Sequence, residues 1–226
     1  KCFYDKTNHK AYVQLKAYRE RLLSNKEKIT ITDLGAGSKR FKTMERSIKA
    51  IAKTSGTPLK RVELLFRIVN YFKPQHILEL GTSLGIATQA MALGNKKATV
   101  TSIEGSPDLS AVARQQLDTF NIENAILKTG RFEAQLPTLA QQTWDLVFFD
   151  GNHQKEATLH YFEQLLPTVH NDSIFILDDI YWSKGMTEAW QTIKQHPKVA
   201  TTLDSFYWGV VFFKKELSKE NFKIRV

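Results

Sequence analysis

The chain has 226 residues and a mass of 25.9 kDa, the size of one domain or of one domain with an extension. Hydrophobic residues make up 42% and charged residues 24%, which excludes a disordered chain, a collagen-like fibre and a coiled coil. No apolar run approaches the roughly 18 residues that span a bilayer, so no membrane span is expected. The first residues lack the apolar core of a signal peptide, and the single cysteine, Cys2, cannot form an internal disulfide. Both observations favour a cytoplasmic location.

The net charge of +9 is unevenly distributed along the chain. Residues 1–73 contain 18 Lys and Arg against 6 Asp and Glu, whereas residues 74–226 contain 14 against 17. A basic segment attracts an anionic substrate, a nucleic acid or a membrane surface, although solvated helix faces would give the same count. The asymmetry predicts two parts: a basic helical N-terminal extension or lid over residues 1–73, and a second domain over residues 74–226.

The first third of the chain reads as helical. Apolar residues recur at spacings of three and four in a first helix, as in a single buried stripe: Tyr12, Leu15, Tyr18 and Leu22. A second helix is expected near residues 41–53. A third begins after Thr57, which suits an N-cap, with Pro58 as its first helical residue.

From Pro74 onward, short apolar runs alternate with helical stretches. Strands are expected at residues 76–80, 98–104, 125–129, 144–150, 173–179, 199–206 and 209–213. Helices are expected at residues 84–93, 107–120, 132–139, 154–166 and 184–195. This alternation predicts an α/β fold, a doubly wound and mostly parallel seven-stranded sheet with helices on both faces. Only Tyr207 and Trp208 separate the last two of these strands, which should therefore form an antiparallel hairpin.

A glycine loop follows the first strand of this sheet. The segment from Glu79 through Gly81, Thr82 and Ser83 to Gly85 has the spacing Glu-x-Gly-x-x-x-Gly. Glycines let the backbone approach a ligand closely, and the N–H groups at the following helix start can hold a carboxylate. The spacing is not the Gly-x-Gly-x-x-Gly of dinucleotide binding, which argues against a nicotinamide or flavin enzyme.

The second strand ends in Glu104 and Gly105, and an acid at that tip can accept hydrogen bonds from both hydroxyls of a ribose. Together with the loop, this resembles the class I S-adenosylmethionine-dependent methyltransferases, which have a Rossmann-like sheet. The resemblance implies that the glycine loop holds the methionine part of S-adenosylmethionine and that Glu104 holds its ribose. It places the adenine contacts after the third strand and adds the strand-four acid to the cofactor site: Gly130, Arg131, Phe132 and Asp150.

An earlier segment, from Asp33 to Ser38, imitates the glycine loop. We reject it as the cofactor loop because no acid-tipped strand follows it in register. Its two glycines, followed by Lys39 and Arg40, could form an anion-binding nest, and a flexible turn with solvated charges is the alternative.

Three carboxylates should converge where the fourth and fifth strands end: Asp150, Asp178 and Asp179. Close negative charges repel unless protons or a cation neutralise them, and hard oxygen ligands favour Mg²⁺, Ca²⁺ or Mn²⁺. The arrangement resembles the cation-dependent small-molecule O-methyltransferases of the catechol, caffeoyl-CoA and macrolide-sugar types. The resemblance implies that the three aspartates bind the metal and that His153, three residues after Asp150, is the general base. A helix-capping role for the second aspartate and an ordinary helix-start role for His153 are the alternatives.

These residues predict a methyltransferase that transfers a methyl group from S-adenosylmethionine to a small-molecule hydroxyl with the help of a divalent cation. The basic N-terminal helices should fold over the mouth of the site and favour an anionic acceptor. Four aromatic residues near the strand ends could form a wall for a flat substrate or plug the core: Tyr181, Trp182, Tyr207 and Trp208.

The alternative is a nucleic-acid methyltransferase that holds RNA with its basic segment. The strand-four sequence Asp-Gly-Asn-His lacks the Asn/Asp-Pro-Pro-aromatic motif of base N-methylating enzymes and disfavours nucleic acid as a partner. A cofactor-binding protein without catalysis is a third reading, which the intact carboxylate cluster disfavours. A homodimer is compatible with the sequence, which does not decide the oligomeric state.

Overall fold

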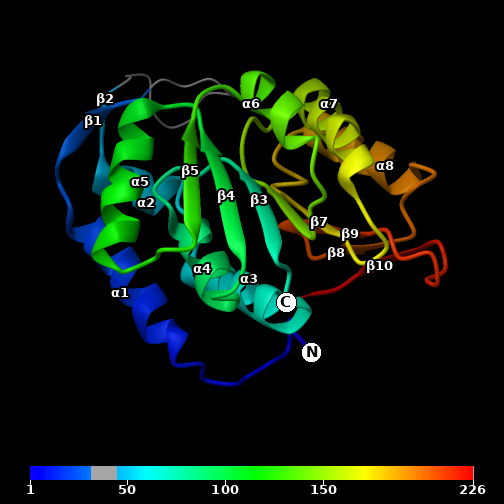
Figure 1. Cartoon of the computed structure of the whole chain (residues 1–226), viewed down its shortest axis with the longest axis horizontal. Helices are drawn as coiled ribbons and strands as arrows, with labels where there is room; N and C mark the ends of the chain where they lie inside the picture. Colours follow the sequence, from blue (N-terminus) through cyan, green and yellow to red (C-terminus); the bar gives the residue numbers. More distant parts are fainter. Residues whose placement is uncertain (32–44, 226) are drawn as a thin grey trace.

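The computed structural model describes residues 1–31 and 45–225. Its main sheet has eight strands in the spatial order β10-β8-β9-β7-β6-β3-β4-β5 (Figure 1). Within this sheet β9 runs antiparallel to its neighbours β7 and β8, and the remaining pairs are parallel. In chain order the strands are β3 (His76–Leu80), β4 (Thr99–Glu104), β5 (Ala125–Thr129), β6 (Leu146–Phe149), β7 (Ile174–Asp178), β8 (Thr201–Asp204), β9 (Trp208–Phe212) and β10 (Glu220–Lys223).

Helices cover both faces of this sheet, so the molecule has three layers (Figure 1). One core lies under α1 (Ala11–Ser24), α2 (Ile48–Thr54), α3 (Leu59–Phe72), α4 (Ile86–Gly94) and α5 (Pro107–Thr119). The other lies under α6 (Phe132–Leu139), α7 (Lys155–Leu165) and α8 (Lys184–Gln195). Successive strand residues point to opposite faces, so Ile77 belongs to the first core and Leu78 to the second. The doubly wound fold predicted from the sequence is confirmed.

The N-terminal helices share the first core instead of forming a separate one. Tyr18 of α1 is fully buried, and its hydroxyl donates to the backbone oxygen of Leu84 over 2.9 Å, at the start of α4. The guanidinium of Arg67 in α3 donates to the backbone oxygen of Cys2 over 2.7 Å. The boundary at residue 73 therefore marks the end of α3 and not the edge of a core, and a functional division there stays a prediction.

All seven expected strands form, and the predicted hairpin pairs β8 with β9. The sheet has an eighth strand, β10, which lies parallel to β8 at the edge. It was missed because all four of its residues are exposed and it carries no apolar alternation. A two-stranded sheet of β1 (Lys28–Thr30) and β2 (Glu45–Ser47) was also missed, because only three residues form each strand and such a short run shows no clear apolar alternation.

The helix expected near residues 41–53 begins later than predicted. Residues 45–47 are the strand β2, and Ser47 caps α2 by accepting a hydrogen bond from the backbone N–H of Ala50 over 3.2 Å. Residues 41–44 lie outside the described part of the chain. Thr57 is not the N-cap of α3, because Pro58 takes that position and the helix begins at Leu59. In the described ranges, no helix is long and apolar enough to cross a membrane.

Docking of α1 on α4 can be tested at Tyr18. Its ring fills a fully buried position, so we expect Tyr18→Ala to lower the free energy of unfolding by about 3–5 kcal/mol, measured by urea denaturation. Val13→Ala lies on the exposed side of the same helix and should change it by less than about 0.5 kcal/mol. Equal denaturation midpoints for Tyr18→Ala and the wild type would show that α1 is not docked.

Candidate active site

A cavity of about 730 Å³ lies at the carboxyl ends of the central strands. It is centred where β3 has β4 on one side and β6 on the other, the point at which the chain reverses its direction across the sheet. Ligands bind at such switch points in open α/β sheets because the loops on either side diverge. Most of the predicted site residues line it: Gly81, Ser83, Glu104, Gly105, Gly130, Arg131, Phe132, Asp150, His153, Asp178 and Asp179.

The loop between β3 and α4 presents Ser83 to the cavity, and its glycines are needed for close packing. Gly81 has a φ of 109°, and a Cβ there would come within 2.3 Å of the backbone oxygen of Asp150. Gly85 has a φ of 75°, and a Cβ there would meet the hydroxyl of Tyr18 at 2.6 Å. Thr82 and Gly85 do not line the cavity, so only Gly81 and Ser83 of this loop are placed to contact a ligand there.

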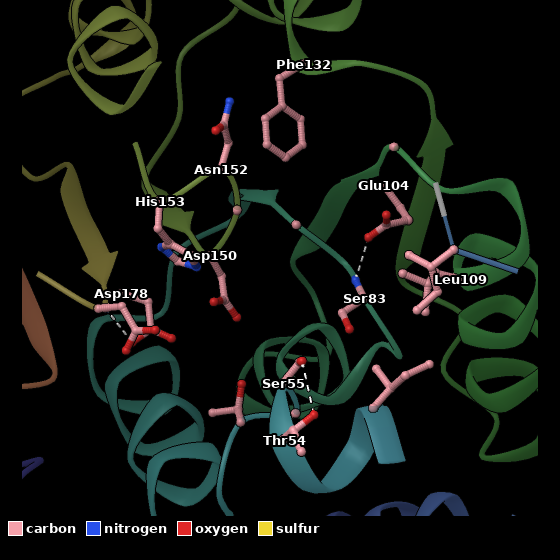
Figure 2. Close-up of a pocket in the computed structure, with 18 of the residues that line it drawn as sticks. Thr54, Ser55, Ser83, Glu104, Leu109, Phe132, Asp150, Asn152, His153 and Asp178 are labelled. Atoms are coloured by element: carbon pink, nitrogen blue, oxygen red, sulfur yellow. Dashed lines mark hydrogen bonds between the residues drawn. The ribbon is translucent and has the colours of Figure 1, made fainter. Parts of the chain in front are cut away.

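Glu104 ties the tip of β4 to the glycine loop. Its Oε2 accepts a hydrogen bond from the backbone N–H of Ser83 over 2.7 Å (Figure 2). Its Oε1 accepts one from the backbone N–H of Ser106 over 2.8 Å. Burial raises the pKa of Glu104, and these backbone hydrogen bonds oppose the rise. Each carboxylate oxygen keeps a second lone pair for a ligand hydroxyl. The residue is therefore placed as a bidentate acceptor for a pair of hydroxyls.

Glu79 is fully buried beneath the glycine loop. Its Oε2 accepts hydrogen bonds from the hydroxyls of Thr88 and Ser102, both over 2.5 Å, and its Oε1 has no hydrogen-bond partner among the described residues. Burial raises its pKa from 4.5 to about 8, the two hydroxyls lower it, and the charge of Glu104 raises it. Glu79 does not line the cavity, so it can act on a ligand only at a distance, as a carboxyl whose ionisation a nearby positive charge would favour. An acidic floor favours a cationic ligand such as a sulfonium and disfavours a phosphate.

The end of the cavity beyond Glu104 is formed by Phe132 and a hydrogen-bonded group that the sequence reasoning missed. Asn152 donates to the hydroxyl of Tyr161 over 3.0 Å, and that hydroxyl donates to Glu133. Burial and the hydrogen bond to Glu133 raise the pKa of Tyr161 to about 12, so it remains neutral. The ring of Phe132 packs against Gly151, where a Cβ would come within 2.8 Å of it. No local motif marks Tyr161 or Asn152, which meet only when α7 packs on the β6 end.

The predicted acidic cluster is present on the opposite side of the cavity from Glu104 and Ser83, with His153 beside Asp150 and Asp178 (Figure 2). Burial, followed by the charge and hydrogen bonding of Asp178, raises the pKa of Asp150 well above its usual range. Burial and Asp178 also raise the pKa of Asp179, whereas His153 and Arg61 lower it. Asp178 therefore lies close enough to Asp150 to make the ionisation of Asp150 less favourable.

Arg61 of α3 was not predicted, and it pairs with this cluster. Its Nη1 lies 3.0 Å from Oδ1 of Asp178 and 4.0 Å from Oδ1 of Asp179. In the described ranges, no three acidic or histidine side chains form a ready-made metal site. The donor chemistry still suits a hard divalent cation, because Asp150 and Asp178 bring carboxylate oxygens close together at the cavity wall. Metal binding by Asp150, Asp178 and Asp179 stays a prediction.

Residues of the N-terminal part of the chain line the cavity, and a lid function of residues 1–73 stays a prediction. The lining residues of this part include four cationic side chains and a short turn before α3: Arg19, Arg46, Lys53, Arg61 and residues 54–58. The imitation glycine segment from Asp33 to Ser38 lies outside the described residues. Of the four aromatic candidates, Trp182 lines the cavity, whereas Trp208 is 1% exposed and packs edge-on against Phe148 in the core.

The buried charge of Glu79 predicts a pH dependence of stability. With a pKa of about 8, folded Glu79 retains a proton that the unfolded chain has lost above pH 4.5. The free energy of unfolding should therefore fall as pH rises from about 5 to 8. Glu79→Gln keeps an oxygen for Thr88 and Ser102 and should flatten the slope, leaving the same-signed part from Asp150. Urea denaturation at several pH values measures the slope of the unfolding free energy against pH. Glu123→Gln, which replaces an exposed carboxylate, is the control and should keep the slope of the wild type. A slope in Glu79→Gln as steep as that of the wild type would contradict the prediction.

Comparison with known proteins agrees with this geometry. Residues 78–180 match the family model described as a methyltransferase domain. Over 104 residues the chain is 34% identical to catechol O-methyltransferase B of Danio rerio, a match that covers 43% of this chain and 38% of that protein. The chain thus spans well under half the length of this curated relative.

Solved structures with related folds cover more of the chain. The O-methyltransferase from Bacillus cereus in complex with S-adenosylhomocysteine is 21% identical, covers 72% of this chain and 86% of its own, and has a TM-score of 0.63. The S-adenosylhomocysteine-bound methyltransferase PaMTH1 of Podospora anserina is 16% identical, with a TM-score of 0.67, and the match covers 95% of this chain and 92% of that protein. TomG of Streptomyces achromogenes, an O-methyltransferase of tomaymycin synthesis, is 14% identical, with a TM-score of 0.65, and the match covers 92% of this chain and 91% of that protein. Residues 78–180 therefore match a methyltransferase domain, and the fold of the chain resembles that of the catechol and caffeoyl-CoA type of S-adenosylmethionine-dependent O-methyltransferase.

Proposed function

We propose that the protein transfers the methyl group of S-adenosylmethionine to a hydroxyl of a small molecule, with the assistance of a divalent cation. The observation that carries this proposal is the position of the Asp150, His153 and Asp178 cluster, which shares one cavity with the glycine loop and Glu104. A cofactor site and a set of groups able to activate a hydroxyl thus open into the same space. The identity to catechol O-methyltransferase B supports the choice of oxygen as the acceptor atom.

The cofactor half of the cavity fits S-adenosylmethionine by charge and by shape. The cofactor supplies an electrophilic methyl group on a positively charged sulfur. Glu104 would accept hydrogen bonds from the ribose hydroxyls, and Ser83 and Gly81 would line the methionine part. Phe132 would pack on the adenine, with Gly130 and Arg131 beside it. The pKa values of the Glu79 and Asp150 carboxyls are raised, and a sulfonium in this cavity would favour their ionisation, whereas the phosphates of a dinucleotide would oppose it.

The other half of the cavity would bind the acceptor and remove its proton. A divalent cation bound at Asp150 and Asp178 would lower the pKa of a coordinated hydroxyl. His153 lies at this cluster, and its neutral imidazole would accept the hydroxyl proton as the oxygen attacks. Asp179, whose pKa both His153 and Arg61 lower, would hold the resulting imidazolium by its charge. The cationic side chains of the N-terminal part favour an anionic acceptor.

The activity can be tested with methyl-labelled S-adenosylmethionine and a panel of small hydroxyl compounds, including phenols, sugars and their carboxylated or phosphorylated forms. We expect label on a hydroxyl oxygen, and transfer should be lost in excess EDTA and restored by Mg²⁺ or Mn²⁺. Label appearing on RNA and on no small hydroxyl compound would contradict the acceptor class. Full transfer in EDTA by protein free of bound metal would contradict the cation requirement alone.

The ribose contact can be tested by calorimetry with S-adenosylhomocysteine. Glu104→Ala removes the bidentate acceptor and the bond to Ser83, so we expect binding to weaken by about 1–3 kcal/mol, which is roughly five- to 150-fold. Glu123→Ala removes an exposed carboxylate outside the cavity and serves as the control. Affinity equal to that of the wild type in Glu104→Ala would remove Glu104 from the cofactor site.

The general base can be tested by turnover as a function of pH. His153→Ala should lower kcat by roughly a hundredfold or more and abolish the rise of the rate with pH that deprotonation of an imidazole produces. S-adenosylhomocysteine affinity should change little, because the glycine loop and Glu104 follow other strands, β3 and β4. His160→Ala, an exposed histidine outside the cavity, should behave as the wild type. A near-native rate with an unchanged pH profile in His153→Ala would assign His153 a structural role.

A further inference from the structure

Arg61 occupies a position that local helix chemistry disfavours. It lies in the first turn of α3 next to Lys60, and this turn contains no acidic residue. The N-terminal end of a helix carries a partial positive charge, so two cations there repel it. A residue that local helix electrostatics disfavour must be stabilised by contacts from outside its helix. For Arg61 these contacts come from Asp178 and Asp179, which lie 117 and 118 residues further along the chain.

The guanidinium of Arg61 is contacted on one side by the two aspartates and on the other by an aromatic ring. Nη1 of Arg61 donates to Oδ1 of Asp178 over 3.0 Å, and Asp179 lies 4.0 Å away. On the other side, the guanidinium carbon lies 4.9 Å from the centre of the Tyr207 ring, a cation–π contact supplied by the turn between β8 and β9. The side chains of Arg61 and Asp178 are only 23% and 8% exposed, so solvent screens this pair weakly.

The same carboxylate oxygen is already in use when Arg61 is in place. Oδ1 of Asp178 accepts from Arg61 and also from the backbone N–H of Asp179 over 2.8 Å. A divalent ion at this cluster must therefore share Asp178 with a fixed positive charge, or displace that charge. Sharing is costly because two cations would lie a few ångströms apart in a partly buried site.

We propose that Arg61 is a positioning residue that neutralises the Asp178–Asp179 pair in the absence of metal and thereby limits the affinity of the cluster for divalent cations. This inference rests on the proposed cation site. It also links cation binding to the N-terminal wall, because Arg61, Thr57 and Pro58 line the same cavity and belong to one short segment. Displacement of Arg61 by a cation would free its guanidinium on the acceptor side, where an anionic acceptor could take it up.

The test is Mn²⁺ binding to the full chain, measured by electron paramagnetic resonance of the free ion and by calorimetry, without any acceptor. Arg61→Gln removes the competing charge, so we expect Mn²⁺ to bind about tenfold tighter or more than to the wild type. Arg61→Lys retains the charge and should stay within about threefold of the wild type. Lys60→Gln removes an equal charge from the same helix turn but outside the cavity, and should change the affinity by less than about twofold.

Mn²⁺ affinity of Arg61→Gln that is equal to or weaker than that of the wild type would overturn the inference. If that variant does not fold, Tyr207→Ala loosens the same guanidinium from the opposite side and should tighten Mn²⁺ binding severalfold; unchanged affinity there would overturn the inference as well. The proposed function fails separately. Tighter Mn²⁺ binding in Arg61→Gln without methyl transfer to any hydroxyl would overturn the function and retain the role of Arg61. Methyl transfer to a hydroxyl without Mn²⁺ binding to either protein would overturn the role of Arg61 and the cation requirement, and would retain the methyl transfer itself.

Discussion

Burial of negative charge at the carboxyl ends of β3, β6 and β7 is the constraint on which the rest of this site depends. Glu79 and Asp178 are buried there and Asp150 is partly buried, and isolated buried carboxylates are strongly unfavourable. Hydrogen bonds offset part of this cost: the hydroxyls of Thr88 and Ser102 donate to Glu79, and the guanidinium of Arg61 donates to Asp178. What remains uncompensated is an electrostatic preference for cations, and a sulfonium cofactor and a divalent metal ion both satisfy it.

The N-terminal part of the chain completes the site and is held to it by the core. Tyr18 packs against Gly85 at the base of the cofactor loop, so α1 supports the loop from behind. Arg61 reaches from α3 across the cavity to the β7 end. The N-terminal part therefore supports the glycine loop and also contacts the acidic cluster, and four of its cationic side chains line the cavity: Arg19, Arg46, Lys53 and Arg61.

The sheet and the cofactor loop could be predicted from the sequence because their signals are local. Each central strand is a short apolar run followed by a turn, and Gly81, Gly85 and Glu104 stand at fixed distances from strand ends. The strand β10 could not be predicted, because its four exposed residues are ordered by pairing with β8 and not by a pattern of their own. Arg61 could not be predicted either, because its helix position looks like any solvated basic residue until Asp178 is brought beside it.

Charge selectivity for the ligand tests this account most directly. Calorimetric titration of the full chain with S-adenosylmethionine and with ATP compares two adenosine ligands, one with a positive sulfur and one with a polyanionic tail. A positive sulfur would favour ionisation of the Glu79 and Asp150 carboxyls, whereas a polyanionic tail would oppose it, so we expect S-adenosylmethionine to bind at least about a hundredfold tighter than ATP. ATP binding as tight as that of S-adenosylmethionine, or tighter, would contradict it.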